Sequence, residues 1–287
     1  MESRGALWEW FEPRRRAYPW RRRPGPYRVL VSEVMLQQTQ AARVGPAFER
    51  FVAAFPTVRA LADAPTAAVL RTWGGLGHNR RALALHRAAR AIVRDHGGRV
   101  PRDPAVLVSL PGVGPYTAAA VASLAFGAPV AAIDVNVRRV VSRALLGGAA
   151  GDVEGAAAAW LDRDDPGRWN QALMDLGREV CRSVPRCGVC PVAPACRFRR
   201  ADAAVGSALP RARRQPPFPG SSRQVRGAVV RVLRDRPRSS VKRLADETGH
   251  PPARVAQAVV ALHREGLVAA GPAALRGDPR GSVRLAD

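Results

Sequence analysis

Residues 110–116 read Leu-Pro-Gly-Val-Gly-Pro-Tyr and lie between two segments with helical patterns. Glycines at this point let the chain turn tightly and leave backbone N–H groups exposed at the start of the next helix. Those donors and the helix dipole favour an anion such as phosphate. The stretch therefore predicts a phosphate-binding turn between two helices. An ordinary Gly-rich turn is the alternative for these residues taken alone.

The charge of the chain indicates a polyanionic partner. There are 46 Lys and Arg residues against 23 Asp and Glu residues, which gives a formal net charge of +23. Basic side chains displace the counterions condensed on nucleic acid, so DNA or RNA is the expected partner, and a basic-biased proteome is the alternative. Lys242 is the only lysine, so residues 1–200 carry no side-chain amine that could form a Schiff base.

Four cysteines, the only ones in the chain, follow the spacing C-x5-C-x2-C-x5-C: Cys181, Cys187, Cys190 and Cys196. The N-terminus has no secretory signal pattern, and no apolar run approaches the ~18 residues of a membrane span. We therefore expect a cytoplasmic protein in which clustered cysteines bind metal rather than form disulfides. A bacterial, nucleoid-associated location is a further expectation. Zinc and a 4Fe–4S cluster both accept four thiolates.

Residues 1–200 have an all-α pattern with short Gly and Pro punctuation and no convincing alternating strand. One helix is expected from Pro26 through Met35, and another is expected to start at Gly45-Pro46. Asp103-Pro104 reads as an N-cap followed by proline at the first helical position. A further helix is expected over 79–95, ended by glycines.

The last third of the chain reads as a separate small domain. Residues 206–222 form a basic, proline-rich stretch that is typical of a linker. Three short helical patterns and a terminal hairpin follow, in the order of a winged helix. We expect a first domain over 1–205 and a winged-helix-like domain over 223–287. The helices are expected at 224–234, 241–248 and 252–266, and the hairpin strands at 267–270 and 282–285.

Several motifs, in one order, strongly resemble the adenine DNA glycosylase (MutY) family of the endonuclease III helix-hairpin-helix superfamily. The resemblance covers about residues 7–200 and implies an all-α helix-hairpin-helix glycosylase fold with an iron–sulfur cluster loop. It also implies a monomeric enzyme that acts on double-stranded DNA and removes adenine opposite 8-oxoguanine or guanine. The motifs are Pro19-Trp20-Arg21, Ser32-Glu33-Val34-Met35-Leu36-Gln37-Gln38-Thr39, Gly75-Leu76-Gly77, Leu110-Pro111-Gly112-Val113-Gly114, Ile133-Asp134-Val135-Asn136-Val137 and the cysteine loop.

Excision of adenine breaks an N-glycosidic bond, which needs a protonated base and a stabilised sugar cation. The resemblance assigns the proton to Glu33 and the cation to Asp134, with Tyr116 and Asn136 in support. It places Gln38 in the opened base stack and Gln37 among the substrate-binding residues, although either glutamine could instead bond backbone or solvent. The remaining implied contacts are Trp20, Arg21 and Asp175 around the flipped base, Gly112 and Gly114 at phosphate, and the four cysteines around a 4Fe–4S cluster.

One position indicates the reaction type, and three other features depart from the family pattern. Members that cut the strand have lysine at position 116, so Tyr116 implies a monofunctional enzyme. His78-Asn79 stands where a Tyr-Tyr pair is common, and the first cysteine interval is one residue short. Residues 223–287 are too short for the Nudix-like domain of larger members. Two alternatives stay open: removal of thymine from T·G mispairs, and non-enzymatic DNA binding.

Overall fold

The computed structural model describes residues 2–22, 24–200 and 217–287. The chain folds into two compact units, and each is built from separate stretches of sequence. The first unit takes Met1–Glu33, Val100–Ser109 and Val113–Ala212, and the second takes Val34–Arg99, Leu110–Gly112 and Arg213–Asp287. Among the described residues, no helix is both long and apolar enough to cross a bilayer.

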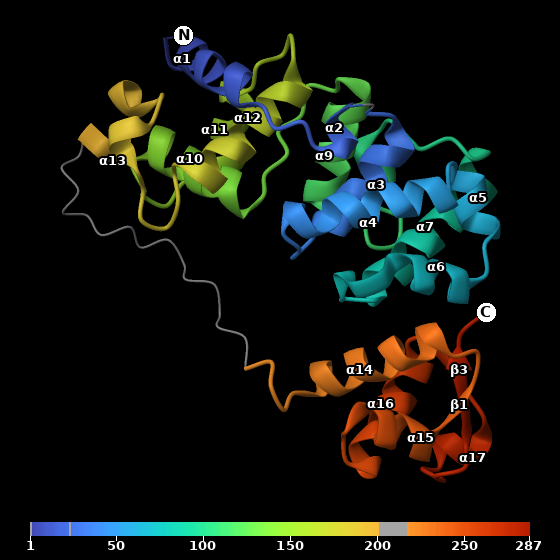
Figure 1. The fold of residues 1–287 in the computed structure, drawn as a ribbon. Coiled ribbons are helices and arrows are strands. Elements are labelled where there is room, and N and C mark those ends of the chain that lie inside the picture. Colours follow the sequence, from blue (N-terminus) through green and yellow to red (C-terminus); the bar gives the residue numbers. More distant parts are fainter. Residues whose placement is uncertain (1, 23, 201–216) are drawn as a thin grey trace. The chain divides into compact units, whose positions relative to one another are not determined.

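The first unit is helical (Figure 1). Its core contains Leu7, Phe11 and Leu173 together with a cluster of tryptophans. The rings of Trp8 and Trp160 meet Trp169 edge-on, at centroid distances of 5.7 and 5.6 Å, and such pairs add about 0.5–1.5 kcal/mol each beyond area burial. The helices are α1 (Glu2–Phe11), α2 (Pro19–Arg22), the start of α3 (Pro26–Leu36), α8 (Pro104–Leu107), α9 (Pro115–Phe126), α10 (Val135–Leu146), α11 (Val153–Trp160), α12 (Pro166–Glu179) and α13 (Arg197–Arg200).

Aspartates begin several of these helices because their carboxylates accept hydrogen bonds from first-turn N–H groups. Asp103 caps α8 with proline at the next position, as its sequence predicts. Asp165 caps α12 in the same manner, and Asp134 caps α10. The cysteine loop follows α12 and contains two short 3-10 turns, η3 (Cys187–Val189) and η4 (Ala193–Ala195). The N-terminus of α10 and the cysteine loop therefore both lie within the first unit.

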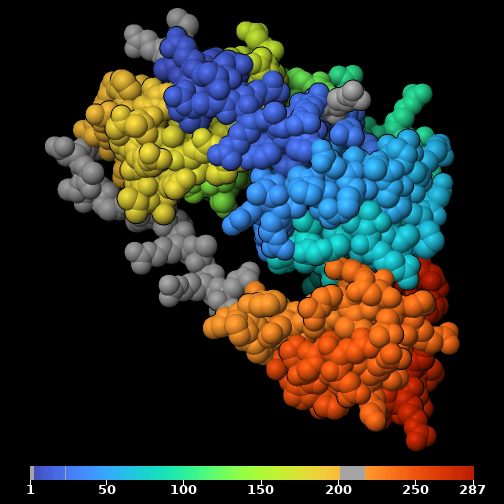
Figure 2. All heavy atoms as spheres, viewed as in Figure 1, coloured from blue at the N-terminus to red at the C-terminus, as the bar shows by residue number. Residues whose placement is uncertain are grey.

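The second unit contains the end of α3 and four helices that follow it: α4 (Ala41–Ala54), α5 (Val58–Asp63), α6 (Thr66–Trp73) and α7 (Arg80–His96). Helix α4 packs on α6, and Figure 2 shows their atoms in close contact on one face. Helix α7 ends at Gly97, whose φ of 61° is left-handed, so the expected helix over 79–95 is confirmed.

The expected start of a helix at Gly45-Pro46 is wrong. Helix α4 begins at Ala41, with Gln40 in extended conformation as the N-cap, and Pro46 lies inside it. Proline has no N–H and its ring crowds the carbonyl four residues earlier, so one backbone bond near the N-terminal end is lost. Burial of Val44, Phe48 and Phe51 on one face of α4 outweighs that loss.

The C-terminal region, residues 217–287, also belongs to the second unit and confirms the winged-helix order. Strands β2 and β3 pair antiparallel, with Val268 opposite Leu285, as expected for the terminal hairpin. A third strand was not expected, because its two residues are too few to show alternation. The expected linker lies outside the described residues as far as residue 216. The elements are α14 (Ser222–Asp235), β1 (Ser239–Ser240), α15 (Val241–Thr248), α16 (Pro252–Arg264), β2 (Val268–Ala270), α17 (Pro272–Leu275) and β3 (Ser282–Leu285), with sheet order β1-β3-β2.

Candidate active site

A buried carboxyl group on α3 is the centre of the candidate site. Glu33 is 4% exposed, and the Tyr116 hydroxyl at the start of α9 donates to its Oε2 at 2.9 Å. The same hydroxyl lies 3.7 Å from the Met174 sulfur on α12. Three helices of the first unit therefore converge on one acid, with one specific donor to it.

Burial raises the pKa of Glu33 to about 7, because a carboxylate is poorly solvated in an apolar interior. The hydrogen bond from Tyr116 acts in the opposite direction, Asp134 raises the pKa further, and Arg21 lowers it. Burial also raises the pKa of Tyr116 well above its usual value, so this hydroxyl stays protonated and donates. Glu33 can therefore both give and accept a proton near neutral pH.

Asp134 presents a second carboxyl group in a different environment. Its Oδ1 accepts from the backbone N–H groups of Asn136 and Val137 at 2.8 and 2.7 Å. The Asn136 side-chain amide donates to Oδ2 at 2.8 Å. Three donors and the positive end of α10 stabilise negative charge at this carboxylate. The pair thus combines a protonatable acid with a fixed anion, as hydrolysis at a sugar carbon requires.

A chain of hydrogen bonds connects Asp134 to the cysteine loop. The Arg139 guanidinium on α10 donates to the Asn136 side-chain oxygen at 2.9 Å, to the Gly177 carbonyl at 2.7 Å and to the Cys181 carbonyl at 2.6 Å. Gly177 lies against Asn136, because a Cβ built at Gly177 would meet the Asn136 Cβ at 2.7 Å. The position of Asn136 therefore depends on where the cysteine loop begins. Sequence reasoning did not find Arg139.

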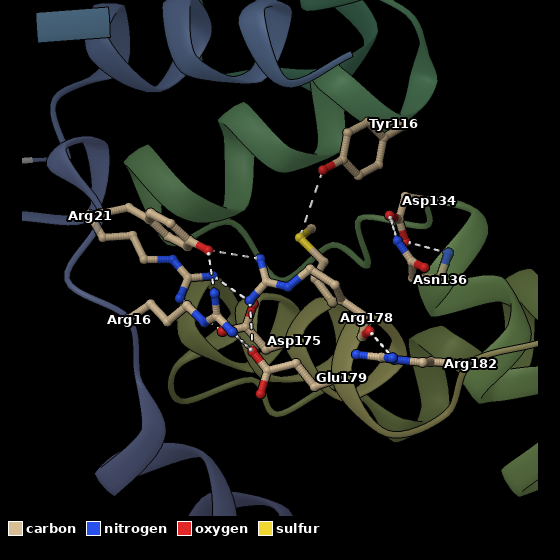
Figure 3. A network of polar contacts seen from close by, with 11 residues as sticks. Arg16, Arg21, Tyr116, Asp134, Asn136, Asp175, Arg178, Glu179 and Arg182 are labelled. Carbon is tan, nitrogen blue, oxygen red and sulfur yellow. Dashed lines mark hydrogen bonds and ion pairs between the residues drawn. The ribbon is translucent and has the colours of Figure 1, made fainter. Parts of the chain in front are cut away.

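An ion-pair network lies beside these groups (Figure 3). Arg21 on α2 binds Asp175 on α12 with two bonds of 2.9 and 3.1 Å, and their side chains are only 8% and 5% exposed. Arg178 also donates to Asp175 at 3.0 Å. The ring of Trp20 stacks on the ring of Tyr18 with a centroid distance of 4.7 Å, and this contact holds the Trp20 side chain in place. The structure thus brings Trp20, Arg21 and Asp175 together, with Asp175 fully engaged by arginines.

The four cysteines line one pocket of the first unit, and each is half-buried. Arg143 on α10 lies over it: its guanidinium is 3.7 Å from the Cys181 sulfur and donates to the Ser183 carbonyl at 2.9 Å. No three His, Cys, Asp or Glu side chains of the described residues are grouped to hold a single metal ion. An all-thiolate set spread around a pocket fits a multi-iron cluster, in which each thiolate binds a different iron, better than one zinc ion.

The predicted glycines and glutamines are divided between the two units. Gly114 is the N-cap of α9, and a Cβ there would meet nothing within 4 Å. Gln37, Gln38 and Gly112 belong to the second unit. The Gln37 amide donates to the Gly112 carbonyl at 3.3 Å, whereas Gln38 is exposed and has a left-handed φ of 55°. Gly112 has a φ of 77°, which explains why glycine stands there.

Gln171 on α12 is a polar group that sequence reasoning missed. It is 9% exposed, and its Oε1 has no hydrogen-bond partner within the part of the chain that the structure describes. It precedes Asp175 by four residues, one helical turn, on the helix that also carries Met174. That spacing is the signal that would have placed it near Asp175. A buried amide oxygen without a donor costs free energy.

Several known proteins resemble this chain in sequence. Residues 31–160 match the HhH-GPD superfamily of base excision DNA repair proteins. Adenine DNA glycosylase of Mycolicibacterium smegmatis is 44% identical over 237 residues, which cover 80% of this chain and 79% of the relative. That of Mycobacterium tuberculosis is 46% identical over 238 residues, with 79% and 77% covered. Human adenine DNA glycosylase is 41% identical over 214 residues, which cover 69% of this chain and 39% of the human protein.

Two solved structures resemble the fold. A thermostable thymine-DNA glycosylase matches with a TM-score of 0.63 and 29% identity, over 69% of this chain and 94% of that one. A non-covalent endonuclease III–DNA complex matches with a TM-score of 0.58 and 26% identity, over 69% and 95% of the two chains.

Proposed function

This chain belongs to the adenine DNA glycosylase family, within the HhH-GPD superfamily of base excision DNA repair proteins, and we propose that it releases adenine mispaired with 8-oxoguanine or guanine in duplex DNA. The observation that carries the proposal is the buried Glu33 carboxyl, which has a pKa of about 7 and accepts a hydrogen bond from Tyr116. A DNA N-glycosylase that removes a purine needs such an acid at neutral pH.

In the proposed mechanism, Glu33 protonates adenine at N7 and thereby makes the base a better leaving group. The sugar left behind carries positive charge, and Asp134 stabilises it by charge or by a transient covalent bond. Tyr116 orients Glu33, and Asn136 orients the Asp134 carboxylate through its 2.8 Å bond. Glu33, once deprotonated, accepts a proton from the attacking water.

The pocket residues have distinct proposed roles. Trp20 lies against the flipped base as an apolar wall, and Arg21 is held in place by Asp175. Gln38 enters the opened base stack, supported by Gln37. Backbone N–H groups at Gly112 and Gly114 bind phosphate.

The cysteine loop is proposed to hold a 4Fe–4S cluster through Cys181, Cys187, Cys190 and Cys196. When bound, the cluster would supply a rigid cross-link between the two ends of the loop. Arg143 lies against the Cys181 thiol. Arg139 donates both to the Cys181 carbonyl and to the Asn136 side chain, so the position of Asn136 depends on the start of the cysteine loop. Arg182 and Arg186, both exposed on the loop, are available to DNA phosphate.

The enzyme is proposed to be monofunctional and monomeric and to act in the bacterial cytoplasm at the nucleoid. Tyr116 occupies the position where a strand-cutting relative would have its lysine, and Lys242 is the only lysine in the sequence. Removal of thymine from T·G mispairs is the second candidate, favoured by the likeness to a thymine-DNA glycosylase. A carboxyl with a pKa of about 7 suits a purine better, since N7 accepts its proton.

Two substitutions test the mechanism in single-turnover assays on an A·8-oxoguanine duplex. Glu33→Gln removes the proton, and Asp134→Asn removes the charge while an amide oxygen still caps α10. We expect each to slow adenine release by about 10²–10⁴-fold with duplex affinity nearly unchanged.

The matched controls are Glu49→Gln, an exposed acid on α4, and Asp103→Asn, the cap of α8. Both should keep wild-type rates. Near wild-type excision by either test variant would refute the proposed mechanism.

A further inference from the structure

The second unit joins two stretches that lie far apart in the sequence, and one arginine of the C-terminal region makes a specific contact between them. The Arg234 guanidinium on α14 donates to the Asn79 side-chain oxygen at 2.6 Å. The Arg234 carbonyl accepts from the Arg71 guanidinium at 3.2 Å. Asn79 is the N-cap residue of α7, so α14 is bonded to the turn that begins this helix.

Glu265, just after α16, makes the second contact. Its two oxygens bind Arg80 at 2.6 Å and Arg226, and its side chain is only 14% exposed. Burial acts to raise the pKa of Glu265, but hydrogen bonds from Arg80 and Arg226 prevail and lower it. The carboxylate is therefore charged and partly shielded, a setting in which an ion pair contributes more than on an open surface.

The turn held by these contacts is strained and exposed. His78 has a left-handed φ of 46° and follows Gly77 at 71°. A side chain in this region costs about 1–2 kcal/mol and persists only where neighbours impose it. Here Trp73 Nε1 donates to the Gly77 carbonyl at 3.0 Å, while Asn79 and Arg80 are held by the C-terminal region.

Arg81 connects this turn to a second strained turn. Its guanidinium donates to the Val34 and Met35 carbonyls at 3.0 and 2.8 Å, to the Gln37 carbonyl, and to the Thr39 hydroxyl at 2.9 Å. These groups end α3, the helix that carries Glu33. Among the described non-glycine residues, only Gln38 and His78 have positive φ, and Arg81 bonds the segments that contain both.

Adenine is the same base in a mispair and in a normal A·T pair. Discrimination between mispaired and paired adenine must therefore depend on residues outside the adenine pocket. The turns that contain Gln38 and His78 are suited to this role, because both are exposed and strained and Arg81 bonds them to the end of α3. We propose that Arg234 and Glu265 form a latch through which the C-terminal region holds the His78 turn in the conformation that selects mispaired duplexes. The latch positions the turn and does not itself contact the base opposite adenine. The inference rests on the proposed function.

The test uses the full chain with Arg234→Ala and Glu265→Gln, and Arg231→Ala as the matched control. Arg231 is an exposed arginine of the same helix, so its loss changes charge without touching the latch. Single-turnover rates are measured on A·8-oxoguanine, A·G and A·T duplexes, together with hydrogen exchange of residues 74–81 in the free protein. We expect both latch variants to reduce the preference for A·8-oxoguanine and A·G over A·T by at least about fivefold and to speed exchange in this turn.

The control should keep the wild-type preference and wild-type exchange. Unchanged preference in both latch variants would overturn the proposal. Duplex affinity is also measured at several salt concentrations. An equal loss of affinity in all three variants, with a weaker dependence on salt, would also overturn the proposal, because that pattern indicates direct phosphate contact by the C-terminal region. A wild-type chain that released no adenine at all would refute the proposed function instead, and the hydrogen-exchange comparison would still report on the latch.

Discussion

At the scale of single residues, the environment of a carboxyl group decides its chemistry. Glu33 and Asp134 are both acids of the first unit, yet one is desolvated beside a phenol and the other is bonded by three N–H groups. The first setting favours the protonated form of Glu33, and the second holds the Asp134 carboxylate in one orientation. The sequence motifs predict which residues are involved, but only the packing gives this contrast.

The pH dependence of adenine release tests the role of Tyr116. Because Glu33 has a pKa of about 7 and acts when protonated, the single-turnover rate should fall above about pH 7. The Tyr116 hydrogen bond lowers this pKa, so Tyr116→Phe should move the fall to higher pH. Tyr27→Phe, on the first turn of α3, is the control and should leave the inflection in place. A fall at the same pH in Tyr116→Phe would mean that another group sets it.

Asp175 is expected to matter for stability as well as for the pocket. Asp175→Ala leaves the Arg21 guanidinium buried without its bidentate partner, which should lower the free energy of unfolding by about 3–5 kcal/mol. Asp95→Ala removes an exposed pair with Arg94 and should leave the denaturation midpoint unchanged. Equal midpoints for the two variants would contradict the buried-pair interpretation.

The residues that sequence reasoning missed share a physical cause. Gln171 and Arg139 have no motif of their own. Gln171 stands out by an oxygen without a partner among the described residues, and Arg139 by its bonds between α10, α12 and the cysteine loop. Such features depend on helix packing, which the order of motifs along the chain does not specify. Glu33 and Asp134, by contrast, stand inside motifs specific enough to be named from the sequence.

At the scale of elements, the turn between α8 and α9 offers a paired test. Gly112 has a φ of 77°, and a Cβ there would lie 2.7 Å from the Ala84 Cβ, so Gly112→Ala should lower the stability by more than the ~1–2 kcal/mol of a left-handed side chain. Gly114 has an ordinary φ and open space around it. Gly114→Ala should keep the wild-type midpoint and weaken duplex binding. Unchanged affinity in Gly114→Ala would argue against backbone contact with phosphate.

The cysteine loop gives a second prediction at this scale. Protein purified without oxygen should contain about four iron atoms per chain, because four thiolates around one pocket suit a 4Fe–4S cluster. Metal analysis of the native protein is the measurement. One zinc atom per chain, with no iron, would show that the loop is a closed tetrahedral site.

At the scale of the whole molecule, the linear order of the sequence and the compact units do not coincide. The prediction of 1–205 and 223–287 as domains follows composition, while the contacts group residues 34–99 with the C-terminal region. The amino-acid composition indicates where a linker lies. It does not indicate that the C-terminal region packs with residues 34–99. The order of these elements was predictable, because each helix has apolar periodicity, α14 and α15 have serine caps, and α16 has proline in its first turn. The division at a linker over 206–222 stays a prediction.

The most direct test of the account is base release by the full-length chain from end-labelled duplexes that contain A·8-oxoguanine, A·G or T·G pairs, each analysed with and without alkali. We expect release of adenine from the first two duplexes, no release of thymine from the third, and strand breaks only after alkali. Release of thymine from T·G with adenine left intact would contradict it.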